Sequence, residues 1–144
     1  MRKEDPTRYS SAVGEAWQHS MFKVKYCHHI FDIKEVREEC DRLFDEASRK
    51  YGIPIQGKGF DSNHVHMKLD IGNYSRPQAA KNLKGYVAKK LFEKFPHIKK
   101  KYFYGSGLWN PSYYMSSPKD LAALDNYLKK QKWYDPSQKR LTAY

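Results

Sequence analysis

The chain has 144 residues, enough for one domain with its own hydrophobic core, and a hydrophobic fraction of 40% with 15% aromatic residues excludes a disordered chain. Lysine and arginine number 27 against 16 acidic residues, and the net charge of +11 favours a polyanionic partner such as nucleic acid over a merely solubilising surface. No run approaches the roughly 20 apolar residues of a membrane span, and no apolar segment follows the charged N-terminus as in a signal peptide, so we expect a cytoplasmic protein without a membrane partner.

The first third of the chain predicts a strand followed by a helix. Residues 20–31 (SMFKVKYCHHIF) begin with apolar residues that alternate with lysines, which predicts a long strand. Asp32 then predicts the N-cap of a helix that ends near Gly52, because apolar residues recur at helical spacing between them. Two cysteines are too few for a disulfide framework. Cys27 and Cys40 both fall within the apolar patterns, so we expect two reduced core residues.

The middle of the chain predicts a β-hairpin and a second helix. Residues 53–60 and 64–71 have the pattern of two strands, and the short polar link between them predicts a tight turn. Ser75 predicts the next N-cap, because Gln78 stands three residues on and completes a capping box. Pro96 is expected to end this helix.

The last third predicts a short strand and a final helix. The strand is expected around residues 112–115. Ser117 is a natural N-cap and Pro118 suits the first helical position, so we predict a helix from there to about Trp133. The order β-α-β-β-α-β is that of an α+β, ferredoxin-like antiparallel sheet with helices on one face, to which the C-terminal helix is added.

These elements predict one domain with short extensions. We expect a flexible, irregular N-terminal arm over residues 1–17, a single domain over residues 18–135 and a polar tail over residues 136–144. The ferredoxin-like fold serves many functions, so the function has to be sought in particular side chains.

Two histidines share one face of the third predicted strand. Residues i and i+2 of a strand point to the same face and lie roughly 6.5–7 Å apart, so His64 and His66 can reach one metal ion while Val65 faces the other side. Two imidazoles and an oxygen form an incomplete shell with open positions, as catalytic metals require. The alternative is an idle pair on a hydrated sheet face.

The final predicted helix carries a tyrosine and a glutamine at helical spacing. Tyr127 and Gln131 are four residues apart, so they share a face. The Gln131 carbonyl oxygen is a candidate third metal ligand, which would place the Tyr127 hydroxyl beside the metal as a nucleophile for a phosphodiester. The alternative is an ordinary half-buried aromatic at the edge of a leucine stripe. Tyr113 and Tyr114 are rival nucleophiles, although neither has a ligand-like partner at helical spacing.

The histidine pair on a strand, together with Tyr127 and Gln131 on a C-terminal helix, resembles the HUH single-tyrosine transposases of bacterial and archaeal insertion sequences, over roughly residues 18–133. The resemblance implies that His64, His66 and Gln131 bind Mg²⁺ or Mn²⁺. It implies that Tyr127 attacks a DNA phosphate and leaves a 5′-phosphotyrosine linkage and a free 3′-hydroxyl. The implied partners are single-stranded DNA with hairpin ends and a second copy of the chain, whose tyrosine helix can complete the other subunit's site.

The sequence departs from this family's pattern in places. Asn63 stands before the first histidine, where an aspartate is frequent, and Lys68 interrupts a strand that is often purely apolar. The segment 109–120 lacks the glycines that are common before the tyrosine helix. No Walker-type loop is visible, so we expect no nucleotide cofactor. An apolar first strand at an exposed edge would also favour a dimer.

Other classes of function account for part of the pattern. A non-catalytic nucleic-acid-binding module of the RRM type would explain the charge and the aromatics, but not the histidine pair, and no RNP-like segment is visible. A relaxase or replication-initiator nickase would use the same chemistry, although those chains are usually larger. A structural zinc protein is disfavoured because the chain has no Cys-x-x-Cys motif.

Overall fold

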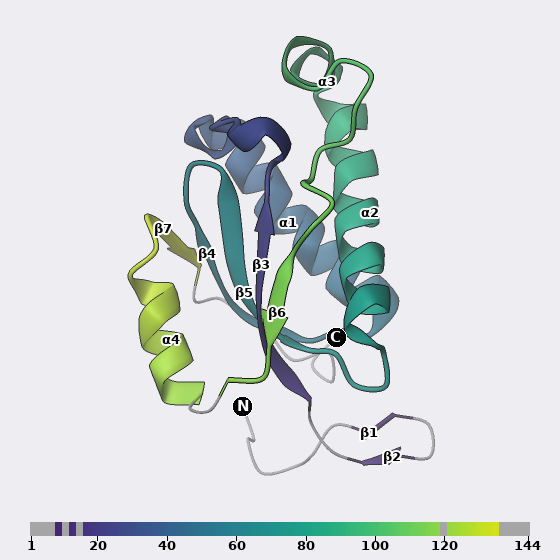
Figure 1. The fold of residues 1–144 in the computed structure, drawn as a ribbon, viewed down its shortest axis with the longest axis vertical. Helices are drawn as coiled ribbons and strands as arrows, with labels where there is room; N and C mark the ends of the chain where they lie inside the picture. Colours follow the sequence, from purple (N-terminus) through teal and green to yellow (C-terminus); the bar gives the residue numbers. More distant parts are fainter. Residues whose placement is uncertain (1–7, 10–11, 14–15, 119–120, 136–144) are drawn as a thin grey trace.

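The computed structural model describes residues 8–9, 12–13, 16–118 and 121–135. Its centre is a five-stranded sheet in the order β6-β3-β5-β4-β7, with every neighbouring pair antiparallel (Figure 1). The main elements are β3 (Trp17–Lys23), α1 (Lys34–Tyr51), β4 (Ile55–Phe60), β5 (His64–Asp70), α2 (Arg76–Lys94), α3 (Pro96–Tyr102), β6 (Tyr114–Ser116), α4 (Leu121–Lys129) and β7 (Trp133–Asp135). The predicted α+β class is confirmed. None of the described helices is long and apolar enough to cross a membrane.

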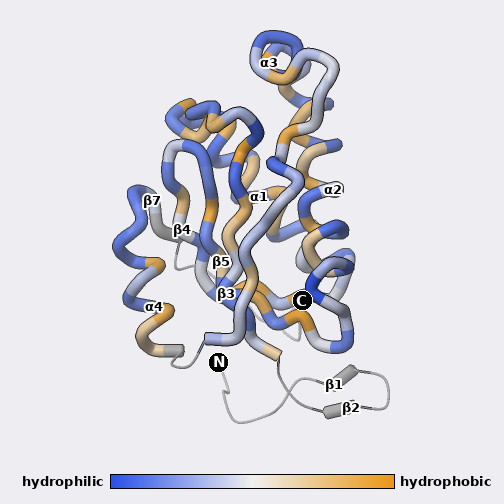
Figure 2. Tube along the Cα trace, in the orientation of Figure 1, coloured by the Kyte–Doolittle hydropathy of each residue, from blue (hydrophilic) through white to orange (hydrophobic). Residues whose placement is uncertain are grey.

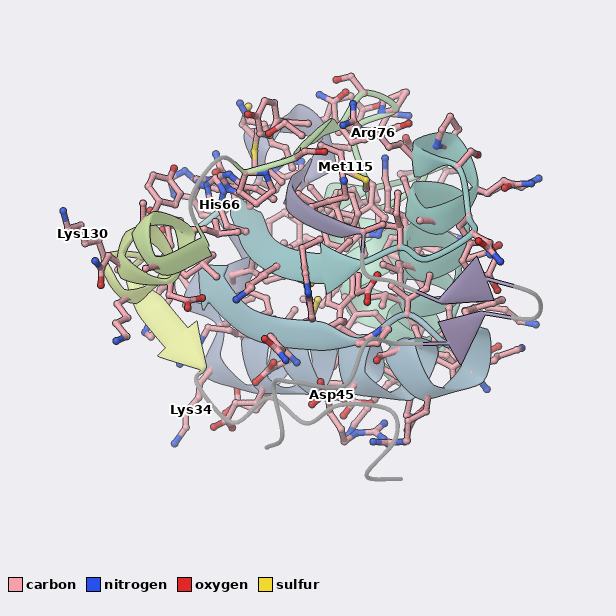
Figure 3. All side chains as sticks on the ribbon, turned by 90° about the horizontal axis from the view of Figure 1, so that it is seen from below. Lys34, Asp45, His66, Arg76, Met115 and Lys130 are labelled. Carbon is pink, nitrogen blue, oxygen red and sulfur yellow. The ribbon has the colours of Figure 1, made fainter. Side chains whose placement is uncertain are left out.

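The two faces of the sheet are covered by different helices. Alternate residues of β5 (Val65, Met67 and Leu69) are fully buried in the core that α1 and α2 close. Between them, His66 and Lys68 point to the other face, where their side chains contact α4 directly. Seen along the sheet, His66 and Asp45 of α1 therefore lie on opposite sides (Figure 3). The position of α4 on the face opposite α1 and α2 was not predicted, because the C-terminal helix was added to the predicted fold without being assigned to a face.

The two long helices begin and end where local chemistry favours it. Hydrophilic and hydrophobic residues alternate along both (Figure 2), and the apolar stripes are buried. Ser75 caps α2 through the predicted capping box, in which its side chain and that of Gln78 each bond the other's backbone N–H. Gly52 ends α1 in the left-handed region with φ of 68°. Asp32 is not the N-cap of α1, because that position is Ile33 and Asp32 lies in a preceding 3-10 turn.

A buried ion pair connects β4 to α1. Lys58 has no exposed surface, and its Nζ lies 2.6 Å from carboxylate oxygens of both Asp41 and Asp45. A bulge in β4 between Ile55 and Lys58 puts both side chains on the face covered by α1 and α2. Without both aspartates the Lys58 ammonium would be an uncompensated buried charge, so these contacts fix the position of β4 on α1.

The predicted first strand is wrong in both bounds. It begins at Trp17 rather than residue 20 and ends at Lys23, because the chain then turns sharply at Tyr26 and Cys27, which have φ of 61° and 56°. Two 3-10 turns (Lys25–Cys27 and Ile30–Asp32) follow. Cys27 is consequently exposed, contrary to prediction, whereas Cys40 is a buried free thiol as expected.

The N-terminal arm is not wholly irregular. Within residues 1–17, β1 (Arg8–Tyr9) pairs with β2 (Ala12–Val13), and Trp17 already belongs to the domain's first strand. The predicted tail over residues 136–144 lies outside the described residues.

The edges of the sheet also differ from expectation. The apolar strand β3 lies between β6 and β5, so it is central and cannot be the exposed edge that favoured a dimer. The edge strands are β6 and β7, each of three residues. β7 and the short helix α3 were not predicted. A second copy of the chain therefore remains an expectation that rests on the family resemblance.

A glycine lets α4 approach the sheet closely. Gly59 of β4 lies opposite His66 of β5. A Cβ added at Gly59 would lie 2.7 Å from Gln131 Cβ, closer still to Gln131 Cγ, and 2.9 Å from the Leu128 carbonyl oxygen. The Leu128 carbonyl belongs to α4 and the Gln131 side chain to the bend that follows it, so any larger residue at this position must push the end of the helix outwards.

Gly59→Ala should therefore destabilise the fold and loosen α4. We expect the free energy of unfolding to fall by about 1–3 kcal/mol, the usual range for overpacking, and the amides of α4 to exchange faster with solvent. Chemical denaturation and hydrogen exchange measure the two effects.

Gly85→Ala is the matched control. Gly85 lies within α2 with no atom within 4 Å of an added Cβ, so the same substitution should stabilise the protein by about 0.5–1 kcal/mol. Equal stabilities of the two variants, with unchanged exchange in α4, would contradict the close packing at Gly59.

Candidate active site

The two strand histidines lie side by side on the α4 face of the sheet. The ring centroids of His64 and His66 are 5.0 Å apart with an interplanar angle of 83°. Val65 is fully buried in the opposite face, as predicted. Among the described residues, no three His, Cys, Asp or Glu side chains form a metal-binding group. A cation at this histidine pair would therefore need an amide oxygen, water or substrate to complete its shell.

Asn63 fixes the orientation of His64. The Nδ1 atom of His64 lies 2.7 Å from Asn63 Oδ1, and an amide oxygen can only accept, so Nδ1 carries the proton. The neutral ring then has its lone pair on Nε2, the arrangement that metal-binding histidines use. Asn63, a departure from the family pattern, thus supplies the same kind of acceptor that an aspartate would.

Tyr127 lies against His66. The Tyr127 Oη is 3.4 Å from His66 Nε2, and the two rings meet edge to face with centroids 5.0 Å apart. The Tyr127 side chain remains 43% exposed, so an incoming substrate can reach its hydroxyl. The structure thus brings the predicted nucleophile and one predicted metal ligand of the same chain together.

Gln131 lies over the neighbouring strand β4, but not within the helix that was predicted to carry it. The helix ends at Lys129, because the next two backbone N–H groups bond to carbonyls three residues back, and Gln131 follows in a bend before β7. Its side chain lies over Gly59, the residue paired with His66. Gln131 therefore does not share a helical face with Tyr127, because α4 ends at Lys129 and the following bend places the Gln131 side chain over Gly59.

A third histidine was missed. His19 Nε2 lies 2.9 Å from His66 Nδ1, and the His19 ring also meets that of Tyr127 at 5.3 Å. The predicted strand began at residue 20, so the alternation that places His19 on this face was not extended far enough. A strand pattern that started at Trp17 would have found it.

The two rival tyrosines point to different faces. Tyr113 packs edge to face on the core residue Phe22, 6.4 Å between centroids. Tyr114 lies on β6 beside His19, at 5.5 Å, and its hydroxyl bonds Ser116 Oγ at 2.7 Å. Tyr127 is therefore the one of these three tyrosines whose hydroxyl contacts the histidine pair.

Lys68 attaches α4 to the sheet. Its ammonium group lies 3.3 Å from Asp125 Oδ1 on α4 and 5.3 Å from the centre of the Trp17 ring. The lysine that interrupts the apolar strand pattern therefore points to the α4 face, where it has both an ionic and an aromatic partner.

Burial keeps the site histidines neutral. Burial and the nearby imidazoles of His19 and His64 lower the pKa of His66 to about 3. Burial also lowers the pKa of His19 and of His64. Neutral imidazoles are the metal-binding form, so the site is ready for a cation throughout the neutral pH range.

The lowered pKa of His66 predicts a loss of stability in mild acid. The unfolded chain takes up a proton below about pH 6.5 that the folded site takes up only near pH 3, so stability falls as the pH falls through this window. For His66 alone the loss between pH 7 and pH 5 is about 2 kcal/mol. Urea unfolding in EDTA at both pH values should show a smaller loss in His66→Gln. Equal losses in the two proteins would contradict a buried neutral His66.

Known proteins resemble this chain in sequence. A family model described as "Transposase IS200 like" matches residues 12–131. The ISDra2 transposase TnpA of Deinococcus radiodurans is 28% identical over 116 residues, covering 78% of this chain and 81% of that protein.

Two solved structures show the same fold. A transposase candidate from Deinococcus radiodurans R1 superposes with a TM-score of 0.70 at 25% identity, over 87% of this chain and 97% of that one. A REP-associated tyrosine transposase bound to a REP hairpin superposes with a TM-score of 0.54 at 10% identity, over 85% of this chain and 68% of that one. The family model spans most of the chain, from residue 12 to Gln131, and the chain therefore belongs to the IS200-like transposase family.

Proposed function

We propose that this protein is a single-strand DNA endonuclease and ligase that moves an insertion sequence through a 5′-phosphotyrosine intermediate, with Tyr127 as the nucleophile. The observation that carries the proposal is the 3.4 Å approach of the Tyr127 hydroxyl to His66 Nε2. Membership of a transposase family assigns cleavage and transfer of DNA strands to the chain. The identity of the nucleophile, the metal and the single-stranded substrate belong to the proposal.

His64, His66 and Gln131 would hold a divalent cation, Mg²⁺ or Mn²⁺. Two imidazole nitrogens and an amide oxygen leave open positions in a six-coordinate shell, which suits a catalytic cation. When bound, such a cation polarises a phosphate oxygen and favours the ionised form of a neighbouring phenol. All three side chains are neutral, so they do not cancel the charge offered to the phosphate.

Tyr127 would perform both halves of the reaction. Its oxygen forms a bond to phosphorus as the bond from phosphorus to the 3′ oxygen breaks, the phenol proton passes to solvent and the 3′ oxygen takes up a proton. The covalent linkage conserves the energy of the phosphodiester. A 3′-hydroxyl can then attack the phosphotyrosine and restore Tyr127, so rejoining needs no nucleotide cofactor.

The charge of the protein supports a nucleic-acid partner. The net charge of +11 favours phosphate contacts. A groove of about 490 Å³ is lined by residues of α1 and α2, among them Lys50, Tyr51, Lys81, Tyr86, Lys89 and Lys90. Lysines beside aromatic rings suit both phosphates and exposed bases. We propose hairpin-ended single-stranded DNA as the substrate and a homodimer as the working form.

The alternative functions account for less. A non-catalytic RRM-like module would give no role to the contact between Tyr127 and His66. A relaxase or replication initiator could use that contact, but the matching family model is that of a transposase.

Tyr127→Phe removes one oxygen and should eliminate the covalent DNA adduct. The ring that packs against His66 is kept, so the free energy of unfolding should change by less than about 1 kcal/mol. The assay is a denaturing gel of protein incubated with Mn²⁺ and a hairpin-containing single strand labelled 3′ of the break. Wild type should give a shifted protein–DNA band and the variant none.

Hairpin binding measured on the same samples is the control. Tyr127→Phe, His64→Ala and His66→Ala should all bind the hairpin within a few-fold of wild type, because phosphate contacts elsewhere dominate affinity. An undiminished covalent band in Tyr127→Phe would assign the nucleophile to another residue. A covalent protein–DNA band of wild-type intensity in either histidine variant would contradict the proposed metal site.

A further inference from the structure

His19 is joined to the site by one short hydrogen bond. Its Nε2 lies 2.9 Å from His66 Nδ1, and the two ring centroids are 5.1 Å apart. Met21 of β3 is the direct partner of His66 of β5, so His19 is its diagonal neighbour on the same face. The proposed chemistry gives His19 no role of its own, because its Nε2 atom is bonded to His66 rather than directed at the substrate.

The hydrogen bond between the two imidazoles admits two proton arrangements. In the first, His66 Nδ1–H donates to His19 Nε2, and the lone pair of His66 lies on Nε2. In the second, His19 Nε2–H donates to His66 Nδ1, and His66 Nε2 carries the other proton. A neutral imidazole has one N–H, so only the first leaves His66 Nε2 free to bind a cation beside Tyr127.

The neighbouring histidine gives a reason to choose between these arrangements. His64 Nδ1 is bonded to the oxygen of Asn63, which cannot donate, so His64 is held with its lone pair on Nε2. A site that binds one cation through both histidines needs the same arrangement at His66. Outer acceptors of this kind orient metal-binding histidines and raise their affinity.

We propose that His19 is a positioning residue whose Nε2 accepts the Nδ1–H of His66 and so holds the His66 Nε2 lone pair toward Tyr127 and the cation position. The inference rests on the proposed function for its cation, but the proton arrangement of His66 is a property of the protein alone. Asn63 and His19 then have the same role, one for each histidine.

The surroundings of His19 provide a matched pair of variants. Its ring packs edge to face against those of Tyr114 and Tyr127, with centroids 5.5 and 5.3 Å away. His19→Phe keeps an aromatic ring in this position and removes the acceptor. His19→Gln loses the ring but places an amide oxygen where Nε2 lies, so the acceptor is restored.

Direct Mn²⁺ binding, followed by the electron paramagnetic resonance signal of the free ion, is the first measurement. His19→Phe should bind Mn²⁺ about 10–100-fold more weakly than wild type, the usual cost of losing an outer-shell partner. His19→Gln should remain within a few-fold of wild type, and His66→Ala should lose the site. Thermal unfolding of each variant confirms that it is folded.

The second measurement needs no metal. Long-range ¹H–¹⁵N NMR spectra of the metal-free protein distinguish a protonated from an unprotonated imidazole nitrogen. Wild type and His19→Gln should show His66 with a proton on Nδ1 and none on Nε2, whereas His19→Phe should show His66 with the proton moved wholly or partly to Nε2.

The two measurements separate the inference from the function on which it rests. A His66 protonated on Nε2 in the metal-free wild type overturns the role of His19, whatever the protein binds. Equal Mn²⁺ affinity of wild type and His19→Phe, with the site lost in His66→Ala, also overturns it. Wild type that binds no Mn²⁺ but carries His66 protonated on Nδ1 contradicts the proposed metal and supports the contact with His19.

Discussion

The packing of α4 on the sheet at Gly59 is the constraint on which the site depends. The Leu128 carbonyl and the Gln131 side chain occupy the space that any other residue would fill with its Cβ. Because Gly59 is paired with His66, this same contact brings Tyr127 to within 3.4 Å of the imidazole. The ion pair from Lys68 to Asp125 holds the middle of the helix down. The distance between the Tyr127 hydroxyl and His66 is therefore set by backbone packing.

The face under α4 is unusual for a sheet surface because it is polar yet largely enclosed. His66 is 7% exposed, and burial with two neighbouring imidazoles brings its pKa to about 3. Such a ring has to be hydrogen-bonded, and it is bonded to His19 on one nitrogen and approached by Tyr127 on the other. The cost of burying these groups is offset by the core on the opposite face of the sheet. Strongly perturbed groups of this kind are typical of functional sites.

Much of the fold could be predicted because its signals are local. The capping box of Ser75 and the left-handed Gly52 mark helix ends in four or five residues of sequence. The two-residue period of a strand is equally local. Because Val65 points into the core, this two-residue period was enough to assign His64 and His66 to the opposite face.

The errors arose where the deciding contact is distant in sequence. Tyr26 and Cys27 adopt positive φ without being glycines, so nothing local marked the end of the first strand. The end of α4 carries no glycine or proline. The chain leaves the helix there to pair β7 with β4, and Arg37 of α1 lies 4.0 Å from the ring centre of Trp133. The role of Gly59 depends on a helix almost seventy residues away, which no spacing rule reveals.

Identifying the residue that becomes covalently attached to DNA tests the proposed mechanism most directly. The protein–DNA adduct formed with a hairpin-containing single strand can be digested with nuclease and trypsin, and the peptide that carries the nucleotide remnant can be sequenced by mass spectrometry. The account predicts the remnant on Tyr127 alone. A remnant on Tyr114, which lies beside His19 rather than at His66 Nε2, or on any other residue, would contradict it.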